Sequence, residues 1–246
     1  DCILMDGYPT KYTRFMNRLS RWIRGDWQII RWLGRKSPLN LLSKYKIFDN
    51  LRRSLFELSI LVALIYLCII KIANHTKYTG LSILFLGTLV LPYILELLNY
   101  LIGKKEGEEK QKVFTPKVSG LKGIFLRTII TLGCLPYKAY VSLKAITKTL
   151  YRLTISHKNL LEWTTSEEAE KQAKTDILSY NKNMLINIIL GIVAIILYIP
   201  QKSVIALILG VLWIITPSIM CYISKEKKEK KSIEVLDKKE QEYVLE

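Results

Sequence analysis

Long apolar blocks divide the chain, and the charged residues gather between these blocks. The four blocks are Ser54–Ile70, Tyr78–Ile102, Asn181–Ile199 and Val204–Ile223. Each comes close to the roughly 20 residues that a helix needs to cross the hydrocarbon core of a bilayer. Helices in soluble cores are seldom this long and this lacking in a polar face. The pattern therefore predicts an all-α, polytopic membrane segment with four transmembrane helices.

The segments between these blocks complete a predicted division into five parts. Residues 1–53 form the end of a cytoplasmic domain with an interfacial helix, and 54–102 hold the first two spans. Residues 103–180 form a cytoplasmic loop with interfacial amphipathic helices, 181–223 hold the last two spans, and 224–246 form a charged cytoplasmic linker.

The basic residues predict the orientation. Of the 37 Lys and Arg residues, 34 lie in residues 1–53, 103–183 and 225–246. The short connections hold the other three, which are Lys71, Lys77 and Lys202. Because Lys and Arg mark cytoplasmic loops, we expect both ends of the chain and the central loop in the cytoplasm. A net charge of +16 is also typical of nucleic-acid-binding proteins. No zinc-ligand spacing or RNP-like aromatic motif accompanies it, so we expect anionic lipid as the partner and no nucleic acid.

The central loop carries the pattern of helices that lie in the headgroup layer. Three basic residues recur every four positions, namely Lys144, Lys148 and Arg152. Another face carries apolar residues, namely Tyr140, Leu143, Leu150 and Leu153. A basic stripe beside an apolar face suits an interfacial helix. We expect Gly133 and Pro136 to break this region into two such helices.

Several single residues have simple structural interpretations. Glu57 lies four residues after Arg53, which predicts a salt bridge within one helix. Glu96 lies inside the second span, where we favour pairing with a nearby Lys over a role in a polar path. Thr165 and Glu168 have the spacing of a capping box. The four cysteines form no CxxC pair and the two histidines have no neighbouring ligands, so no metal site is predicted.

The densest group of candidate binding residues lies before the first span. It contains Arg18, Arg21, Trp22, Arg24, Asp26 and Trp27. Arginine forks bind phosphates in a bidentate manner, tryptophan faces stack on sugar rings, and an aspartate accepts a sugar hydroxyl. The group fits a site for a nucleotide diphosphate sugar or a growing glucan. It fits a basic juxtamembrane helix with Trp anchors equally well, and the chemistry alone leaves both interpretations open.

Three motifs in this order resemble a known family. RWIRGDWQ begins at Arg21, LLSKYKIFDNLRRSL runs from Leu41 to Leu55, and HKNLLEWTT begins at His157, shortly after the similar stretch Leu150–Leu153. Together they resemble the bacterial cyclic β-1,2-glucan synthases, which are large inner-membrane enzymes related to the processive family-2 glycosyltransferases. The resemblance covers most of residues 1–170, and the last two spans match only in being hydrophobic.

The resemblance implies roles for the cluster. Processive synthases carry a QxxRW motif on an interfacial helix, and Arg18, Arg21 and Trp22 occupy that pattern, with Arg18 in place of the Gln. By this likeness Trp22 stacks on the acceptor sugar and Arg21 contacts the diphosphate. Arg24, Asp26 and Trp27 complete the same wall. The implied activity is glucosyl transfer from UDP-glucose into a β-1,2-glucan.

The resemblance also implies that other parts of the enzyme lie outside this chain. The family's metal-binding DxD and catalytic base precede the motif, and no DxD occurs here. We therefore expect the catalytic residues and the ligands of a divalent cation upstream of Asp1, and no activity from the chain alone. The expected partners are the bilayer, a glucan chain and the remaining domains, in the bacterial inner membrane. Two alternatives are a non-enzymatic scaffold that binds anionic lipid and a processive synthase of another polysaccharide.

Overall fold

The computed structural model describes residues 11–34, 36–74, 79–102, 120–159 and 176–225. Every regular element in these ranges is helical, which confirms the predicted all-α class. The elements are α1 (Tyr12–Gln28), the 3₁₀-helix η1 (Ile30–Leu33), α2 (Leu41–Asn74), α3 (Thr79–Ile102), α4 (Gly120–Tyr151), the π-helix η3 (Arg152–Ser156), α6 (Ile177–Asn183), α7 (Leu185–Gln201) and α8 (Val204–Ile223). The predicted capping box at Thr165 and Glu168 and most of the tail lie outside the described residues.

The helix α2 joins the basic segment and the first span into one rod. It begins after Asn40, whose Oδ1 accepts the backbone N–H of Ser43 at 2.8 Å and so caps the first turn. Its 34 residues pass from a polar first half into the charge-free run from Leu58 to Ile70. The side chains before Leu58 are therefore held at a fixed height relative to the apolar part of the same helix.

Four single helices are long and apolar enough to cross a membrane, and three of them correspond to predicted spans. The candidate spans are Leu41–Ile70, Gly80–Leu101, Gly120–Ser156 and Val204–Ile223. The predicted span over residues 181–199 is not one straight helix, because α6 and α7 meet at a bend of 69° next to Met184. This pair qualifies only as a broken span, and α4 with η3 joins the candidates instead.

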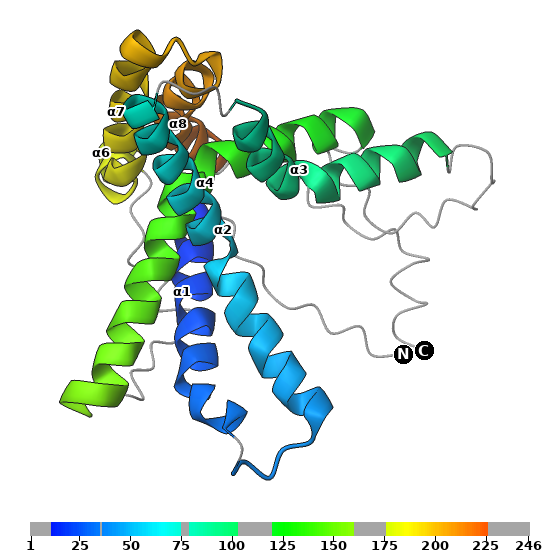
Figure 1. The fold of residues 1–246 in the computed structure, drawn as a ribbon, viewed down its shortest axis with the longest axis vertical. Coiled ribbons are helices and arrows are strands. Elements are labelled where there is room, and N and C mark those ends of the chain that lie inside the picture. The colour runs from blue at the N-terminus through cyan, green and yellow to red at the C-terminus, as the bar shows by residue number, and fades with distance from the viewer. Residues whose placement is uncertain (1–10, 35, 75–78, 103–119, 160–175, 226–246) are drawn as a thin grey trace, which may run out of the picture.

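The predicted break at Gly133 and Pro136 is a bend inside one continuous helix. α4 runs from Gly120 to Tyr151 with Pro136 in its interior. Figure 1 shows its two limbs running in clearly different directions. Proline lacks a backbone N–H and its ring crowds the preceding turn, which bends a helix without ending it when neighbours support both limbs. The expected two helices are thus two limbs of α4.

α4 is the centre of the packing, and it contacts α1, α2, α3, α7 and α8. In Figure 1 its first limb lies beside α3, and its second limb lies beside α1. A buried cluster around Cys134 and Tyr137 joins α4 to α1, α6 and α8. Another, around Leu135 and Ala139, joins it to α2, α3 and α8. A segment expected to lie on the membrane surface is therefore integral to the core.

The face of α4 that packs on α1 differs from the apolar face that the sequence suggested. Ala145, Ile146 and Thr149 are buried, and the first two pack around Ile23 of α1. Tyr140 and Leu143 are exposed, while Leu150 and Leu153 are partly buried. Small side chains let two helix backbones approach closely, which explains why the small-residue face is the packed one.

Candidate functional site

An open cleft of about 950 Å³ lies between α1 and α2, with α4 contributing to its wall. Nine of its fourteen lining residues have polar or charged side chains, unlike the apolar surfaces of the spans. The lining residues are Leu19, Arg21, Trp22, Ile23, Gly25, Asp26, Asn50, Arg52, Arg53, Ser54, Phe56, Glu57, Lys138 and Ser142. The cleft therefore brings together residues from three helices that are far apart in the sequence.

Half of the predicted binding residues lie in this cleft. Arg21, Trp22 and Asp26 line it from α1. Trp22 and Asp26 are four positions apart and therefore share one face of the helix. Trp22 is 54% exposed, so a large part of its side chain is open to the cleft and the solvent. The guanidinium carbon of Arg18 lies 4.6 Å from the centre of the Trp22 ring. This cation–π contact restrains the indole and places Arg18 beside the cleft without lining it.

Asp26 is held in place from across the cleft. Asn50 of α2 donates from Nδ2 to Asp26 Oδ1 at 3.2 Å. Partial burial raises the pKa of the Asp26 carboxyl, while the Asn50 hydrogen bond and the charge of Arg53 act in the opposite direction. The carboxylate keeps acceptor capacity beyond this one bond. It is placed to accept a hydrogen bond from a hydroxyl of a ligand between the helices.

Trp27 and Arg24 do not line the cleft. Trp27 donates from Nε1 to Ser54 Oγ at 2.9 Å, and Ser54 Oγ donates to the carbonyl oxygen of Leu51 at 2.7 Å. Trp27 also packs against the cluster around Ile23 and Ala145. These contacts hold α1 against α2 and α4. Trp27 thus sets the width of the cleft, while Arg24 lies on α1 outside the lining.

The salt bridge predicted between Arg53 and Glu57 is wrong. Arg53 forms an ion pair with Asp49, and Glu57 forms one with Lys138 of α4. Glu57 is buried, since α4 packs over this part of α2. Local spacing could not reveal a partner 81 positions away. The available signal was Lys138 itself, a lone charge between the apolar segments of α4.

Glu96 does form the ion pair that the sequence predicted, but its partner is an arginine. Arg127 of α4 donates from Nη2 to Glu96 Oε1 across the contact between α3 and α4. Both side chains are substantially exposed. The pair explains the presence of a carboxylate in an apolar helix without assigning it to a substrate path.

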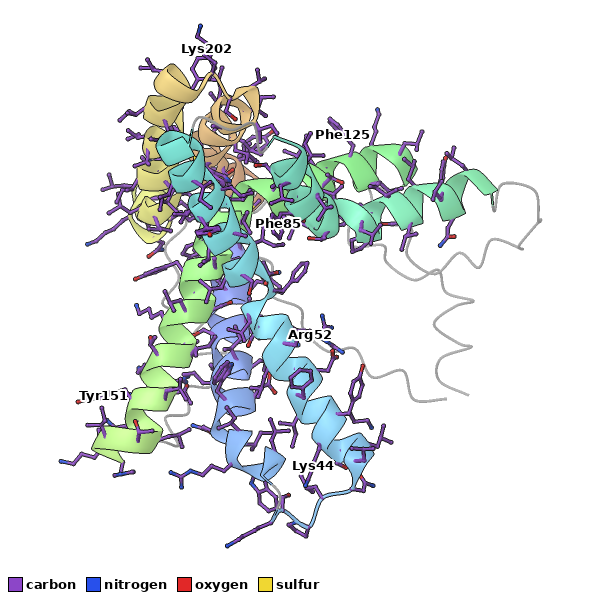
Figure 2. All side chains as sticks on the ribbon, viewed as in Figure 1. Lys44, Arg52, Phe85, Phe125, Tyr151 and Lys202 are labelled. Atoms are coloured by element: carbon purple, nitrogen blue, oxygen red, sulfur yellow. The ribbon has the colours of Figure 1, made fainter. Side chains whose placement is uncertain are left out.

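The sequence analysis also missed three polar residues of α2 that line the cleft: Asn50, Arg52 and Arg53. It treated them as part of a family motif and of a local charge pattern. Figure 2 shows Arg52 projecting from α2 near the middle of the molecule. These three residues line the cleft because α1 packs close to α2. No sequence pattern within either helix specifies that packing.

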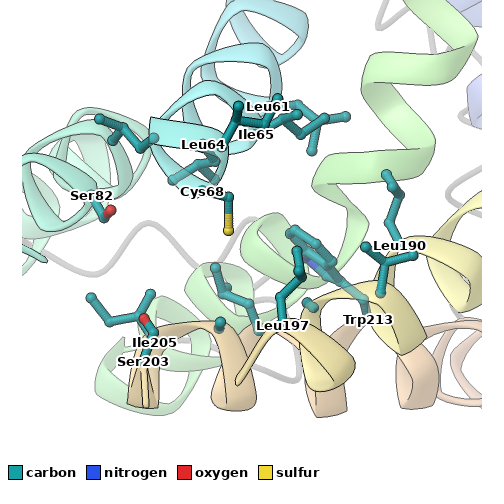
Figure 3. Close-up of a pocket in the computed structure, with 16 residues that line it drawn as sticks. Leu61, Leu64, Ile65, Cys68, Ser82, Leu190, Leu197, Ser203, Ile205 and Trp213 are labelled. Atoms are coloured by element: carbon teal, nitrogen blue, oxygen red, sulfur yellow. The ribbon is translucent and has the colours of Figure 1, made fainter. Parts of the chain in front are cut away.

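A second cavity, of about 390 Å³, is apolar and lies among α2, α3, α7 and α8 (Figure 3). Its walls are mainly aliphatic, with the sulfur of Cys68 and the indole of Trp213 among them. A sugar placed there would lose hydrogen bonds to water and gain few in return. The candidate site for a polar substrate is therefore the cleft between α1 and α2.

No family model matches the chain. It is, however, 24% identical over 229 residues to a curated protein named cyclic beta-(1,2)-glucan synthase NdvB from Rhizobium meliloti (strain 1021). The chain is similar to part of a glucan synthase. The alignment covers 92% of the chain but only 8% of the length of NdvB.

The likeness to NdvB confirms the resemblance to cyclic β-1,2-glucan synthases that the three motifs predicted. It extends across nearly the whole chain, including the last two apolar helices. With the long apolar helices of the fold, it identifies a membrane protein related to a glucan synthase.

Proposed function

We propose that this chain is part of a membrane-embedded glucosyltransferase that transfers glucose from UDP-glucose into a β-1,2-glucan. In this proposal the cleft between α1 and α2 binds the acceptor end of the glucan and the nucleotide diphosphate. The observation that carries the proposal is the meeting of Arg21, Trp22 and Asp26 in one open cleft beside an apolar helix. The likeness to NdvB supports the same class of reaction.

Each side chain has a distinct role in this proposal. The exposed ring of Trp22 stacks on the acceptor sugar and excludes water from one face of it. Arg21 binds a phosphate of the nucleotide, which stabilises the negative charge that develops on the leaving group. Asp26 accepts a hydrogen bond from a hydroxyl of the acceptor sugar and so fixes the rotation of the sugar ring. These three residues bind and orient, while the proton transfer belongs to a base outside the chain.

A divalent cation, if the full enzyme uses one, has no evident ligand set here. Among the described helices, no three His, Cys, Asp or Glu side chains come together as they would around a metal ion. The two carboxylates that line the cleft already have partners. Asp26 accepts a hydrogen bond from Asn50, and Glu57 forms an ion pair with Lys138. No step assigned to these residues depends on a cation.

The proposed orientation places the cleft on the cytoplasmic side of the bacterial inner membrane, where nucleotide sugars are available. The twelve Lys and Arg residues in 1–53, against three in the two short connections, support this orientation. The geometry supports it as well. Lys202, in a short connection expected outside, lies at the opposite end of the molecule from Lys44 and Tyr151 (Figure 2).

The test is to change Trp22 and Arg21 conservatively in the intact enzyme and to measure glucose incorporation from UDP-glucose. Trp22→Phe reduces the stacking surface, and Arg21→Lys removes the bidentate fork while keeping the charge. Loss of a stacking or bidentate contact in a water-poor site corresponds to a fall of roughly a hundredfold or more in activity. Membrane abundance of each variant must match that of the unchanged enzyme.

Trp32→Phe is the matched control, because Trp32 is a similarly exposed tryptophan of η1 outside the cleft. Normal activity in this control with a collapse in both cleft variants would support the proposal. Normal activity in all three variants would favour a non-enzymatic role for the cluster.

The alternative is a scaffold whose basic surfaces bind anionic lipid. One observation favours lipid contact in the second limb of α4, where Lys144 and Lys148 are exposed beside Tyr140 and Leu143. The ammonium of Lys144 lies 5.9 Å from the centre of the Tyr140 ring. A basic and aromatic surface of this kind suits the headgroup layer. It is compatible with the enzymatic proposal, because it lies outside the cleft.

A further inference from the structure

One carboxylate of α2 holds two guanidinium groups that line the cleft. Arg52 donates to Asp49 Oδ1 from Nε at 3.1 Å and from Nη2 at 2.7 Å. Arg53 donates from Nη2 to the other oxygen, Oδ2. The two arginines are adjacent in sequence, and each approaches the carboxylate from its own side. Asp49 thereby fixes the position of both.

The exposed fractions show which partner faces outward. The Asp49 side chain is 13% exposed, whereas those of Arg52 and Arg53 are 58% and 69% exposed. Each guanidinium has five N–H groups, and the contacts with Asp49 use only two from Arg52 and one from Arg53. The largely buried Asp49 carboxylate therefore holds the guanidinium groups of Arg52 and Arg53 in fixed orientations, and both line the cleft.

The charge of the whole cleft points to the same class of ligand. Its lining contains four cationic side chains, Arg21, Arg52, Arg53 and Lys138, and two carboxylates, Asp26 and Glu57. Glu57 is paired with Lys138, and Asp26 faces Asn50. With Asp49 included, positive charges still outnumber negative ones. A concave surface with this excess attracts anions, and planar forks match the geometry of phosphate oxygens.

We propose that Arg52 and Arg53, orientated by Asp49, form a phosphate-binding site in the cleft between α1 and α2. The inference deepens the proposed function and rests on it for the identity of the ligand. There the phosphates belong to the nucleotide of the donor, and Arg52 and Arg53 bind them from the α2 side of the cleft while Arg21 binds them from the α1 side. The same forks would also hold the phosphate of a lipid headgroup, since α2 continues directly into an apolar span.

The experiment compares the Arg52→Gln/Arg53→Gln double variant with the unchanged enzyme, using the full-length protein in nanodiscs. One set of nanodiscs contains only phosphatidylcholine, and a second also contains phosphatidylglycerol. The readouts are KM for UDP-glucose and kcat in both lipids, and displacement of the donor by UDP. Loss of charged hydrogen bonds of this type corresponds to a rise in KM of about tenfold or more.

Lys46→Gln/Lys122→Gln is the matched control, because it removes the same charge from α2 and α4 outside the cleft. A rise in KM and in the UDP concentration needed for displacement in neutral nanodiscs, absent from the control, supports binding of the donor phosphates. If the double variant instead loses only a response of KM to phosphatidylglycerol, the phosphate site stands and the headgroup is its ligand.

Unchanged KM, UDP displacement and lipid response in the double variant would overturn the inference. The Arg21→Gln variant then distinguishes the two failures. If Arg21→Gln abolishes incorporation while Arg52→Gln/Arg53→Gln is silent, the proposed function stands without this phosphate site. If both are silent, the proposed function fails with it. Asp49→Asn tests the orientating role: weaker donor binding despite the more positive site supports it, and tighter binding contradicts it.

Discussion

The indole N–H of Trp213 donates to the carbonyl oxygen of Leu132 at 3.0 Å, and Leu132 lies four residues before Pro136. Pro136 has no N–H, so it cannot provide the usual i→i−4 bond to that carbonyl. The next carbonyl, that of Gly133, accepts a bond from Asn187 Nδ2 at 2.8 Å. Side chains of α7 and α8 therefore satisfy backbone groups at the bend of α4, as a bilayer requires.

We expect Trp213→Phe to lower the stability of the protein by about 1–3 kcal/mol, because it leaves the Leu132 carbonyl without its partner. Thermal unfolding in detergent measures the effect. The control is the same substitution in a Pro136→Ala background, where residue 136 regains an N–H for that carbonyl. A smaller cost there would identify the hydrogen bond as the cause, and an equal cost would assign it to lost packing.

The backbones of α7 and α8 touch at two glycines. A Cβ added to Gly191 would lie 2.8 Å from the carbonyl oxygen of Gly210, and one added to Gly210 would lie 2.8 Å from that of Gly191. Because backbone atoms cannot move aside easily, we expect either Gly→Ala change to destabilise the protein by about 1–3 kcal/mol. Gly87→Ala is the control, since nothing lies within 4 Å of its added Cβ. Equal melting temperatures for all three variants would contradict the close contact.

The ion pair between Glu57 and Lys138 is expected to contribute more than the pair between Glu96 and Arg127. Glu57 is buried, so Lys138→Met leaves a buried carboxylate without its cation, and we expect a loss of several kcal/mol. The Glu96 pair is exposed on both sides, and its loss is expected to cost at most about 1 kcal/mol. Unfolding of Lys138→Met and Arg127→Met under the same conditions compares them. A smaller effect at Lys138 would refute the assignment.

The raised pKa of Asp26 predicts an acid limb in the activity profile. Its carboxyl has a pKa above the ordinary Asp value of 3.8. The rate of glucose incorporation should therefore decline as the pH falls through this raised pKa, because the protonated carboxyl binds a sugar hydroxyl less well. The sign for stability is opposite: a raised carboxyl pKa means that the folded state binds the proton more tightly, so this group destabilises at higher pH and not at lower pH. Asp26→Asn should reduce activity at neutral pH and remove the limb without lowering stability. A limb that persists in Asp26→Asn belongs to another group.

The proposed orientation can be tested with single cysteines in a chain whose four native cysteines are replaced. Lys202→Cys should react with a membrane-impermeant maleimide in intact spheroplasts, because it lies in the short connection expected outside. Lys46→Cys, near the start of α2 and expected on the cytoplasmic side, should react only after lysis. The reverse pattern would invert the topology. A tag within Asn74–Thr79 should behave like Lys202→Cys.

Local pattern was sufficient for much of the fold. Apolar runs predicted helical spans, and the density of Arg, Trp and Asp residues before the first span marked a candidate site, of which Arg21, Trp22 and Asp26 line the cleft. The route of the chain after the second span was not predictable in this way. The limb with Lys144 and Lys148 does carry an exposed basic stripe, but its other side, with the small residues Ala145 and Thr149, is buried, and Ala145 packs against α1.

Partners from distant helices account for what the sequence did not reveal in the site. Lys138 reaches Glu57 only because α4 bends and packs on α2. Asn50 meets Asp26 only because Trp27 and Ser54 hold α1 against α2. Such contacts depend on how helices cross, and neither periodicity nor local spacing encodes a crossing. The cluster was therefore visible in the sequence, whereas the opposite wall of the cleft was not.

The boundary between the cleft and the apolar part of α2 constrains where a glucan could leave. Glu57 lines the cleft, and Leu58, the next residue, begins a charge-free run to Ile70 whose later part lines the apolar cavity. Each sugar hydroxyl moved into that cavity without a hydrogen-bond partner would cost about 2–7 kcal/mol. The passage of a glucan from Trp22 through the apolar cavity among α2, α3, α7 and α8 is therefore energetically unfavourable. Its exit route either stays on the aqueous side or follows polar groups supplied from beyond the described helices.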